Sequence, residues 1–302
     1  MMAAMDAASG ASRTAVLVCQ GRAAAHDRLA VGRFSDPIAT LLLREGERDV
    51  VDWAHSDSPP KDWRQRVESE LVRATAEGMA PRTVAIDDAV RARPTPQLVI
   101  LGAGLDTRAW RMPELAGTAV FEVDHPASQQ DKRDRIGQLA PLAGALRLVP
   151  VVFGHDQLGP ALDTAGHRSS LPTTWLWEGV VPYLTREQVT ATVETLRARS
   201  APGSRLIVNY QHRSLTAVLG RLLMRSLSRL ARRDDPLAGE PRRSSWTPRA
   251  IAALLGGHGF TVTSDDDLLS LAERLPSEVR HRRSLRAGRV LVADLDQDCT
   301  GN

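Results

Sequence analysis

The segment from Gln97 to Met112, QLVILGAGLDTRAWRM, constrains the fold more than any other part of the chain. It opens with a short apolar run rich in β-branching, which is typical of a strand buried on both faces of a parallel sheet. Gly102 and Gly104 follow at once, and because glycine has no Cβ, a ligand can lie directly against the backbone of such a turn. A helix expected to begin near Asp106 or Thr107 would direct its free N–H groups and positive dipole end at that ligand. The segment therefore predicts a ligand-binding strand, turn and helix.

A second strand is predicted from Ala119 to Asp124, AVFEVD, and it ends in a carboxylate. That carboxylate follows the first glycine by about 20 residues, the place where nucleotide-binding doubly wound sheets accept hydrogen bonds from ribose hydroxyls. Asp124 is therefore the predicted ribose ligand. Glu122 has the same facing along the strand but lies deeper, where an unpaired carboxylate would be costly.

The glycine turn also limits which nucleotide can bind. A dinucleotide fingerprint has a third glycine where helix and strand pack beneath a pyrophosphate, and Thr107 stands there in this chain. The departure argues against NAD and FAD. It allows a ligand without a pyrophosphate, of which S-adenosylmethionine is the commonest.

Several segments, in their order and spacing, resemble the S-adenosylmethionine-dependent methyltransferases related to leucine carboxyl methyltransferase. They are ILGAGLDTRAWR, FEVDHPASQQDKR, WLWEGVVPYLT and APGSRLIVNY. Near the N-terminus, SRTA at Ser12 to Ala15 and FSDP at Phe34 to Pro37 resemble the bacterial branch of that family. The resemblance implies an α/β fold, a Rossmann-like doubly wound sheet of seven strands with an N-terminal helical lid, and S-adenosyl-L-methionine as the cofactor. It does not identify the methyl acceptor.

The resemblance also implies roles for three side chains. An arginine at the place of Arg82 holds the methionyl carboxylate in the family, and a guanidinium suits that task because it grips a carboxylate with two parallel hydrogen bonds. Glu178 inherits a contact with the bound cofactor. Tyr183 inherits a place beside the methyl-transfer site and is the catalytic candidate. Taken without the resemblance, Arg82 would lead a helix and could simply be solvated, and Glu178 could cap a turn.

The third strand, predicted from Arg147 to Phe153, departs from the family pattern. Family members carry an acidic residue before the Phe or Leu, and that acid accepts from the adenine amino group. Val152 takes its place here, while Phe153 is retained and is expected to pack on the purine. Asp156 or His155, from the following loop, could supply a polar partner with a different geometry.

The chain is expected to form a single domain, because no Pro/Gly/Ser linker divides its 302 residues. Residues 1–92 are predicted to be an N-terminal helical cap, and residues 93–302 a Rossmann-like core with a helical insertion near 212–250. The cap can close over the cofactor crevice or merely cover the sheet. The insertion, amphipathic and rich in arginine from Leu215, could lie on a membrane, pack on its own domain or line the acceptor pocket. Later segments predict a capping box at Thr185, a helix after Trp246, and two final strands, the last reversed.

Composition excludes several classes of protein. The net charge is +3, yet the chain has only two lysines and no basic segment interleaved with aromatic residues, which argues against nucleic-acid binding. No apolar run of about 18 residues occurs, so no membrane span is expected and the protein is predicted to be cytoplasmic. Cys19 and Cys299 lie far apart, which predicts neither a disulfide framework nor a metal site.

Methyl transfer from a sulfonium needs little beyond positioning and exclusion of water. A carboxylate acceptor requires no base and a hydroxyl usually does, but no dyad in the sequence identifies one, and His125 is interpreted as a wall of the cofactor pocket. The predicted function is O-methylation of a carboxyl or hydroxyl group on a small molecule, with secondary metabolism as a candidate setting. The alternatives are a protein or peptide C-terminal carboxyl methyltransferase and a cofactor-binding protein without transfer, while Thr107 disfavours a nicotinamide dehydrogenase. The acceptor and the oligomeric state do not follow from the sequence.

Overall fold

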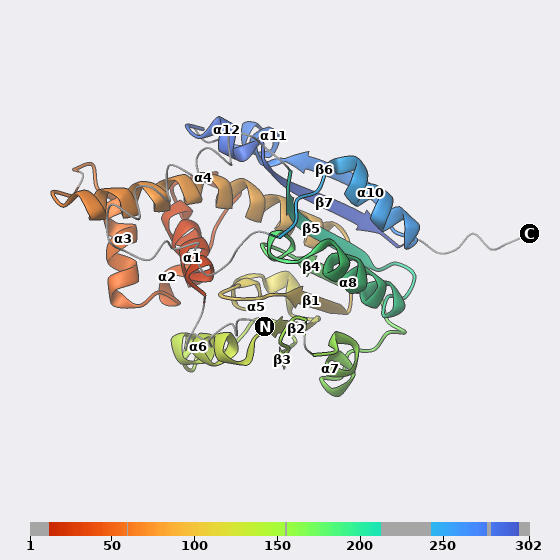
Figure 1. Cartoon of the computed structure of the whole chain (residues 1–302). Helices are drawn as coiled ribbons and strands as arrows, with labels where there is room; N and C mark the ends of the chain where they lie inside the picture. The colour runs from red at the N-terminus through yellow and green to blue at the C-terminus, as the bar shows by residue number, and fades with distance from the viewer. Residues whose placement is uncertain (1–11, 59, 155, 213–242, 277–278, 296–302) are drawn as a thin grey trace, which may run out of the picture.

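The computed structural model describes residues 12–58, 60–154, 156–212, 243–276 and 279–295, and its centre is one seven-stranded sheet (Figure 1). The strands lie in the order β3-β2-β1-β4-β5-β7-β6, and β7 runs antiparallel to both of its neighbours while the other pairs are parallel. The predicted mostly parallel sheet with a reversed last strand is confirmed. The strands are β1 (Gln97–Leu101), β2 (Ala119–Asp124), β3 (Ala145–Pro150), β4 (Thr173–Trp177), β5 (Arg205–Gln211), β6 (Thr261–Asp267) and β7 (Gly288–Asp294).

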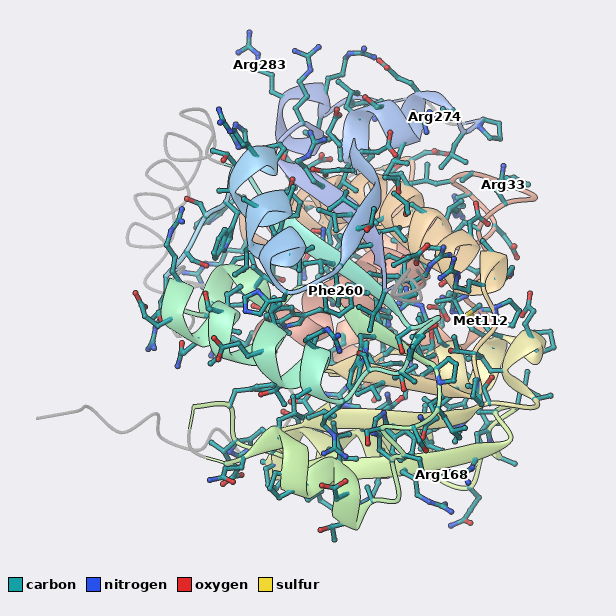
Figure 2. All side chains as sticks on the ribbon, turned by 90° about the vertical axis from the view of Figure 1, so that its right-hand side faces the viewer. Arg33, Met112, Arg168, Phe260, Arg274 and Arg283 are labelled. Carbon is teal, nitrogen blue, oxygen red and sulfur yellow. The ribbon has the colours of Figure 1, made fainter. Side chains whose placement is uncertain are left out.

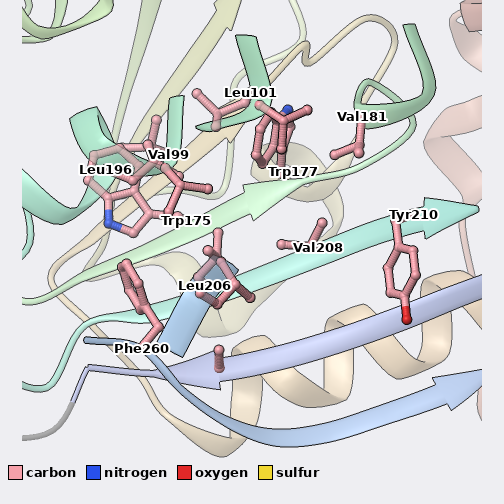
Figure 3. Close-up of a cluster of buried hydrophobic side chains, with 14 of the residues drawn as sticks. Val99, Leu101, Trp175, Trp177, Val181, Leu196, Leu206, Val208, Tyr210 and Phe260 are labelled. Carbon is pink, nitrogen blue, oxygen red and sulfur yellow. The ribbon is translucent and has the colours of Figure 1, made fainter. Parts of the chain in front are cut away.

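Helices cover both faces of the sheet. The two-residue period of a strand divides the side chains of β4, so that Trp175 and Trp177 enter one apolar cluster and Leu176 the other. Figure 3 shows the first cluster, in which both tryptophans lie with Val181 and Phe260. Helices α7 (Leu158–Thr164), α8 (Arg186–Ala198) and α10 (Pro248–Gly257) pack on this face. The opposite face carries α4 (Trp63–Ala92), α5 (Arg108–Arg111), α11 (Leu268–Glu273) and α12 (Arg282–Leu285).

The N-terminal helices form a third apolar cluster of their own, at one end of the sheet (Figure 1). They are α1 (Arg13–Ala25), α2 (Pro37–Leu41) and α3 (Glu45–His55), which pack on one another and on α4. A Cβ built on Gly104 would lie 3.2 Å from the Cβ of Ala15, so the first turn of α1 rests on the glycine turn after β1. The helical cap therefore lies at the carboxyl ends of the strands, where doubly wound sheets bind their ligands.

Side-chain caps begin several of these helices, and the one predicted from the sequence, at Thr185, is confirmed. Ser12 caps α1, Thr185 and Gln188 form the expected capping box of α8, and Thr247 caps α10. His125 caps α6 (Pro126–Ile136). Two short 3₁₀ segments complete the described chain, η1 (Pro113–Leu115) and η2 (Val181–Tyr183).

Two local predictions were wrong. Arg82 does not lead a helix: it lies inside the 30-residue α4, which continues through Pro81. A proline favours the first turn of a helix because it lacks an N–H, but here tertiary packing carries the helix past it. The third strand ends at Pro150, so Phe153 lies in the following turn and not on the strand. The amphipathic pattern from Leu215 lies outside the described residues.

The surface of the described chain is rich in arginine. Arg33, Arg168, Arg274 and Arg283 extend outward in Figure 2, whereas Met112 and Phe260 are buried. No helix within the described ranges is both long enough and apolar enough to cross a bilayer.

Candidate functional site

The turn after β1 needs glycine at two positions. Gly102 has φ of +68° and Gly104 has φ of +49°, which is the left-handed region that favours glycine. A Cβ on Gly102 would lie 2.2 Å from Cγ2 of Val180, so there is no space for a side chain. The N–H of Gly102 donates to the carbonyl of Val123 over 2.8 Å, which ties the turn to the end of β2. The structure thus places the two predicted glycines where the backbone is left-handed and closely approached.

Asp124 ends β2 directly opposite this turn. Its Oδ2 accepts from the N–H of Gly104 over 2.5 Å, and its Oδ1 accepts from the N–H of His125 over 2.6 Å. Burial raises the pKa of Asp124, and the two backbone hydrogen bonds oppose that rise. Each carboxylate oxygen has a second lone pair that remains able to accept from a hydroxyl. The carboxylate therefore lies at the turn in the place expected of a ribose ligand.

Glu122, deeper on the same strand, has an ionic partner at one of its two oxygens, while its other oxygen, Oε1, is buried without a hydrogen-bond partner. The ammonium of Lys132, on α6, lies 2.6 Å from Oε2 of Glu122 and also 4.9 Å from the centre of the Trp110 ring. Burial raises the pKa of Glu122 to about 7, against the attraction of Lys132. This pair lies beneath the turn and is separate from the ribose position.

Glu178 follows β4 immediately and is held between two guanidiniums. Nη1 of Arg108 donates to Oε2 over 2.9 Å, and Nε of Arg82 lies 2.7 Å from Oε1. Burial acts to raise the pKa of Glu178, but the two guanidiniums hold it below its usual value. Burial lowers the pKa of Arg82, with the attraction of Glu178 opposing. The structure thus brings together Arg82 and Glu178, which are 96 residues apart in the sequence.

The contact between Arg82 and Glu178 is an ion pair without the alignment of a hydrogen bond. Nε of Arg82 and Oε1 of Glu178 are both buried and neither has a hydrogen-bond partner. A buried donor and a buried acceptor left in this state are costly. They are suited to a ligand that carries both a carboxylate and an ammonium group, such as the amino-acid end of S-adenosylmethionine. Together with the glycine turn, which a Cβ would fill, these atoms fit the expected cofactor.

Arg108 and Asp87 are the site residues that the sequence reasoning missed. The guanidinium of Arg108 is buried and contacts Asp87 over 2.7 Å as well as Glu178, and it also pairs with Asp106. Asp87 lies five positions after Arg82 on α4, so a chain of alternating charges, from Arg82 through Glu178 and Arg108 to Asp87, joins α4, α5 and the end of β4. The motif GAGLDTRAWR contains Arg108, and a buried arginine needs an acidic partner. The sequence alone does not show which acidic residue that is, because the partner comes from another element of the fold.

The remaining predicted residues lie on the elements around this site. Tyr183 ends η2, five residues after Glu178. Phe153 is half-buried and packs on the cluster shown in Figure 3. The N–H of Val152 donates to Oδ2 of Asp156 over 2.8 Å, which brings that carboxylate beside the position where the family acid is missing. His155 lies outside the described residues.

Comparison with known proteins identifies the family. A profile of the leucine carboxyl methyltransferase family matches residues 15–197. A protein of Mycolicibacterium vanbaalenii, assigned to the S-adenosyl-L-methionine-dependent methyltransferases, is 36% identical over 219 residues, which cover 68% of each chain. One of Mycobacterium marinum with the same assignment is 37% identical over 214 residues, or 67% of each chain.

Two solved structures have a similar fold over nearly the whole chain. A structure from Thermobifida fusca, assigned as a methyltransferase, has a TM-score of 0.54 at 16% identity and covers 97% of both chains. A DUF574 family protein of Streptomyces avermitilis has a TM-score of 0.52 at 14% identity, covering 94% of this chain and 97% of its own. The fold, the glycine turn and the sequence matches agree. The chain belongs to the leucine carboxyl methyltransferase family, a family of S-adenosylmethionine-dependent methyltransferases.

Proposed function

We propose that this methyltransferase is a cytoplasmic O-methyltransferase, whose acceptor is a carboxyl or hydroxyl group of a small molecule. The observation that carries the proposed cofactor site is the carboxylate of Asp124 at hydrogen-bond distance from Gly104. Beside it, at the end of β4, stands the unaligned pair of Arg82 and Glu178. Asp124, the glycine turn and Glu178 lie at the carboxyl ends of the adjacent parallel strands β2, β1 and β4, where doubly wound sheets bind nucleotides.

Each of these side chains has a distinct task in the proposal. Asp124 accepts from the ribose hydroxyls, and Arg82 and Glu178 bind the charged amino-acid end. Phe153 packs on the adenine, and Tyr183 borders the acceptor. The cofactor supplies an activated methyl group on sulfur. The protein then contributes mainly orientation and exclusion of water, because in-line displacement requires the acceptor atom to be held on one axis.

Cofactor binding is tested by calorimetry with S-adenosylhomocysteine and with NAD. We expect S-adenosylhomocysteine to bind in the micromolar range and NAD not to compete with it. A preference for NAD would refute the proposal. The matched variants are Asp124→Asn, at the turn, and Asp134→Asn, on the surface of α6.

The class of acceptor is tested with S-adenosylmethionine labelled in its methyl group. The protein is incubated with an extract of the producing cells, and the label is followed into small molecules and into protein. Label in small molecules is expected. Label confined to protein would instead favour a protein or peptide C-terminal carboxyl methyltransferase, and binding without transfer would favour a cofactor-binding protein.

A further inference from the structure

His212 follows β5 at the edge of the sheet where the proposed site lies. Strands β4 and β5 are parallel, with Trp177 paired to Val208, so Asn209 is level with Glu178 and His212 lies three residues further along, beyond the carboxyl end of β4. The N–H of His212 donates to the carbonyl of Ala287 over 2.8 Å, which fixes its backbone to the neighbouring chain segment. The backbone of His212 is thus held by the end of β5 and by this hydrogen bond, at the edge of the sheet where the strands have their carboxyl ends.

The surroundings of His212 connect it to the acceptor side of the site. Because side chains alternate along a strand, His212 lies on the same face of the sheet as Val208 and Tyr210. These two residues share an apolar cluster with Val181 of η2 (Figure 3). The segment 243–246 crosses from η2 to the end of β5. The hydroxyl of Ser244 in this segment donates to the carbonyl of Val181 over 3.0 Å. The N–H of Trp246 donates to the carbonyl of Gln211 over 3.2 Å. His212 therefore lies against the same segment that contacts η2, the element that ends in Tyr183.

One contact determines which nitrogen of His212 is free. Nδ1 lies 3.3 Å from the carbonyl oxygen of Trp246. Because a carbonyl can only accept, Nδ1 carries the hydrogen and the lone pair of the neutral ring is on Nε2. Among the described residues, the contact of this half-buried ring is the one that Nδ1 makes, and it leaves Nε2 to accept a hydrogen bond. A carbonyl that orients a histidine while its other nitrogen stays open is the arrangement of a general base.

The other histidine at this edge has the opposite arrangement. Nδ1 of His125 accepts from the N–H of Ala127 over 3.2 Å, so its neutral ring carries the hydrogen on Nε2 and has no lone pair to offer there. His167 is buried against Thr173, at the start of β4 and away from the site. Of His125, His167 and His212, only His212 follows a central strand at the carboxyl edge with its free lone pair on Nε2.

We infer that His212 is the general base of the reaction and that the acceptor is a hydroxyl compound, an alcohol or a phenol, because a carboxylate needs no base. This inference rests on the proposed function. Nε2 of His212 takes the hydroxyl proton. The acceptor oxygen forms its new bond to the methyl carbon as the bond of that carbon to sulfur breaks, and the electron pair of that bond stays on sulfur. The imidazolium then releases its proton to water.

The first test needs no acceptor. Nitrogen NMR of the protein labelled in its histidine rings, with S-adenosylhomocysteine bound and above neutral pH, reports which nitrogen of each ring carries hydrogen. We expect the Nδ1–H form for His212, assigned by its loss in His212→Asn, and the Nε2–H form for His125. An Nε2–H form at His212 overturns the inference whatever the activity.

The second test compares His212→Asn with His258→Asn. Asparagine keeps a donor at the place of Nδ1, so the bond to Trp246 can remain while the base is lost. His258 is a matched control because its Nδ1 also contacts a carbonyl, that of Leu254 over 2.8 Å, but in the loop that precedes β6. With labelled S-adenosylmethionine and the cell extract, we expect transfer to fall by about 10²- to 10⁴-fold in His212→Asn only. Affinity for S-adenosylhomocysteine should stay within about twofold of the parent in both variants.

The label also reports the acceptor. A methyl ether survives alkali, whereas a methyl ester releases volatile methanol, so alkali-stable label is expected. Alkali-labile label, or a His212→Asn variant as active as the parent, overturns the inference while leaving the proposed function intact. Absence of S-adenosylhomocysteine binding in the parent refutes the proposed function instead. If the parent protein binds S-adenosylhomocysteine but transfers no labelled methyl group, the NMR result for His212 decides: the Nδ1–H form supports the inference and the Nε2–H form overturns it.

Discussion

Asp124 shows how a single carboxylate can serve both the fold and the ligand. Its two oxygens accept from the backbone of Gly104 and His125, which closes the turn, and their remaining lone pairs are available for hydroxyls. An alanine at this position would release both backbone donors and disturb the turn. Asparagine is the sharper probe, because it keeps one oxygen and removes the charge.

We predict that Asp124→Asn weakens S-adenosylhomocysteine binding by about 1.5–3 kcal/mol, the usual value of a hydrogen bond to a charged group. The loss arises because the neutral amide accepts more weakly and presents a donor where an acceptor is needed. Calorimetry measures it, with Asp134→Asn as the surface control. Unchanged affinity together with a large fall in melting temperature would show that the carboxylate is structural only.

We predict that Arg82→Lys weakens S-adenosylhomocysteine binding by about tenfold or more. Lysine keeps the charge but lacks the planar fork, and a lysine at so buried a position loses its proton more readily. Arg91→Lys is the control on the same helix, since Arg91 is 40% exposed and pairs with Glu114 at the surface. An Arg82→Lys variant that binds as well as the parent would remove Arg82 from the site.

At the scale of elements, the sequence predicts structure best where local chemistry or the family pattern alone determines the residue. The turn glycines, the capping box at Thr185 and the reversed last strand follow from local chemistry or family pattern. The interior course of α4 does not, because Pro81 indicates a helix start until the packing of α4 on α1 and the sheet is known. The pairing of Arg108 with Asp87 and Glu178 is likewise invisible locally, since it joins three separate elements.

We predict that Gly102→Ala lowers the melting temperature and abolishes tight cofactor binding. A Cβ would meet the side chain of Val180 at 2.2 Å on a backbone with φ of +68°, so crowding and backbone strain act together, each costing on the order of 1–3 kcal/mol. Adding Val180→Ala should relieve the crowding but not the strain and should recover stability in part. Gly117→Ala, where a Cβ meets nothing within 4 Å, is the matched control.

At the scale of the molecule, buried charges join the helical cap to the sheet. Asp36, at the start of α2, receives Nε of Arg22 over 2.9 Å and the hydroxyl of Thr107 over 2.7 Å. Arg22 in turn donates to the carbonyl of Leu105, within the glycine turn, over 2.6 Å. Arg111 lies near Asp36 and pairs with Asp87 over 2.6 Å, which extends the network to α4. We therefore propose that the cap is a lid whose position is set by the same charges that order the cofactor site.

This proposal makes Asp36→Asn the most informative variant of the cap. Asparagine can keep the capping bond to the N–H of Ala39, now 3.0 Å from Oδ1, while Arg22 loses its buried counter-ion. Removing one partner of a buried pair costs about 3–5 kcal/mol. We predict a loss of that size in urea unfolding, together with weaker S-adenosylhomocysteine binding, because Arg22 would no longer hold the turn.

The control for Asp36→Asn is Asp88→Asn, which removes a surface ion pair between the helical cap and α4. Asp88, on α4, pairs with Arg33 over 2.7 Å, but these side chains are 48% and 52% exposed. Solvent screens such a pair, so Asp88→Asn should change stability by no more than about 1 kcal/mol and leave cofactor affinity unaltered. If Asp36→Asn behaved like Asp88→Asn, the buried charge of Asp36 would not hold the cap in place. If it lowered stability without affecting binding, the buried charges would hold the cap without coupling it to the cofactor. A loss of both properties in Asp36→Asn alone is the result that a lid coupled to the glycine turn requires.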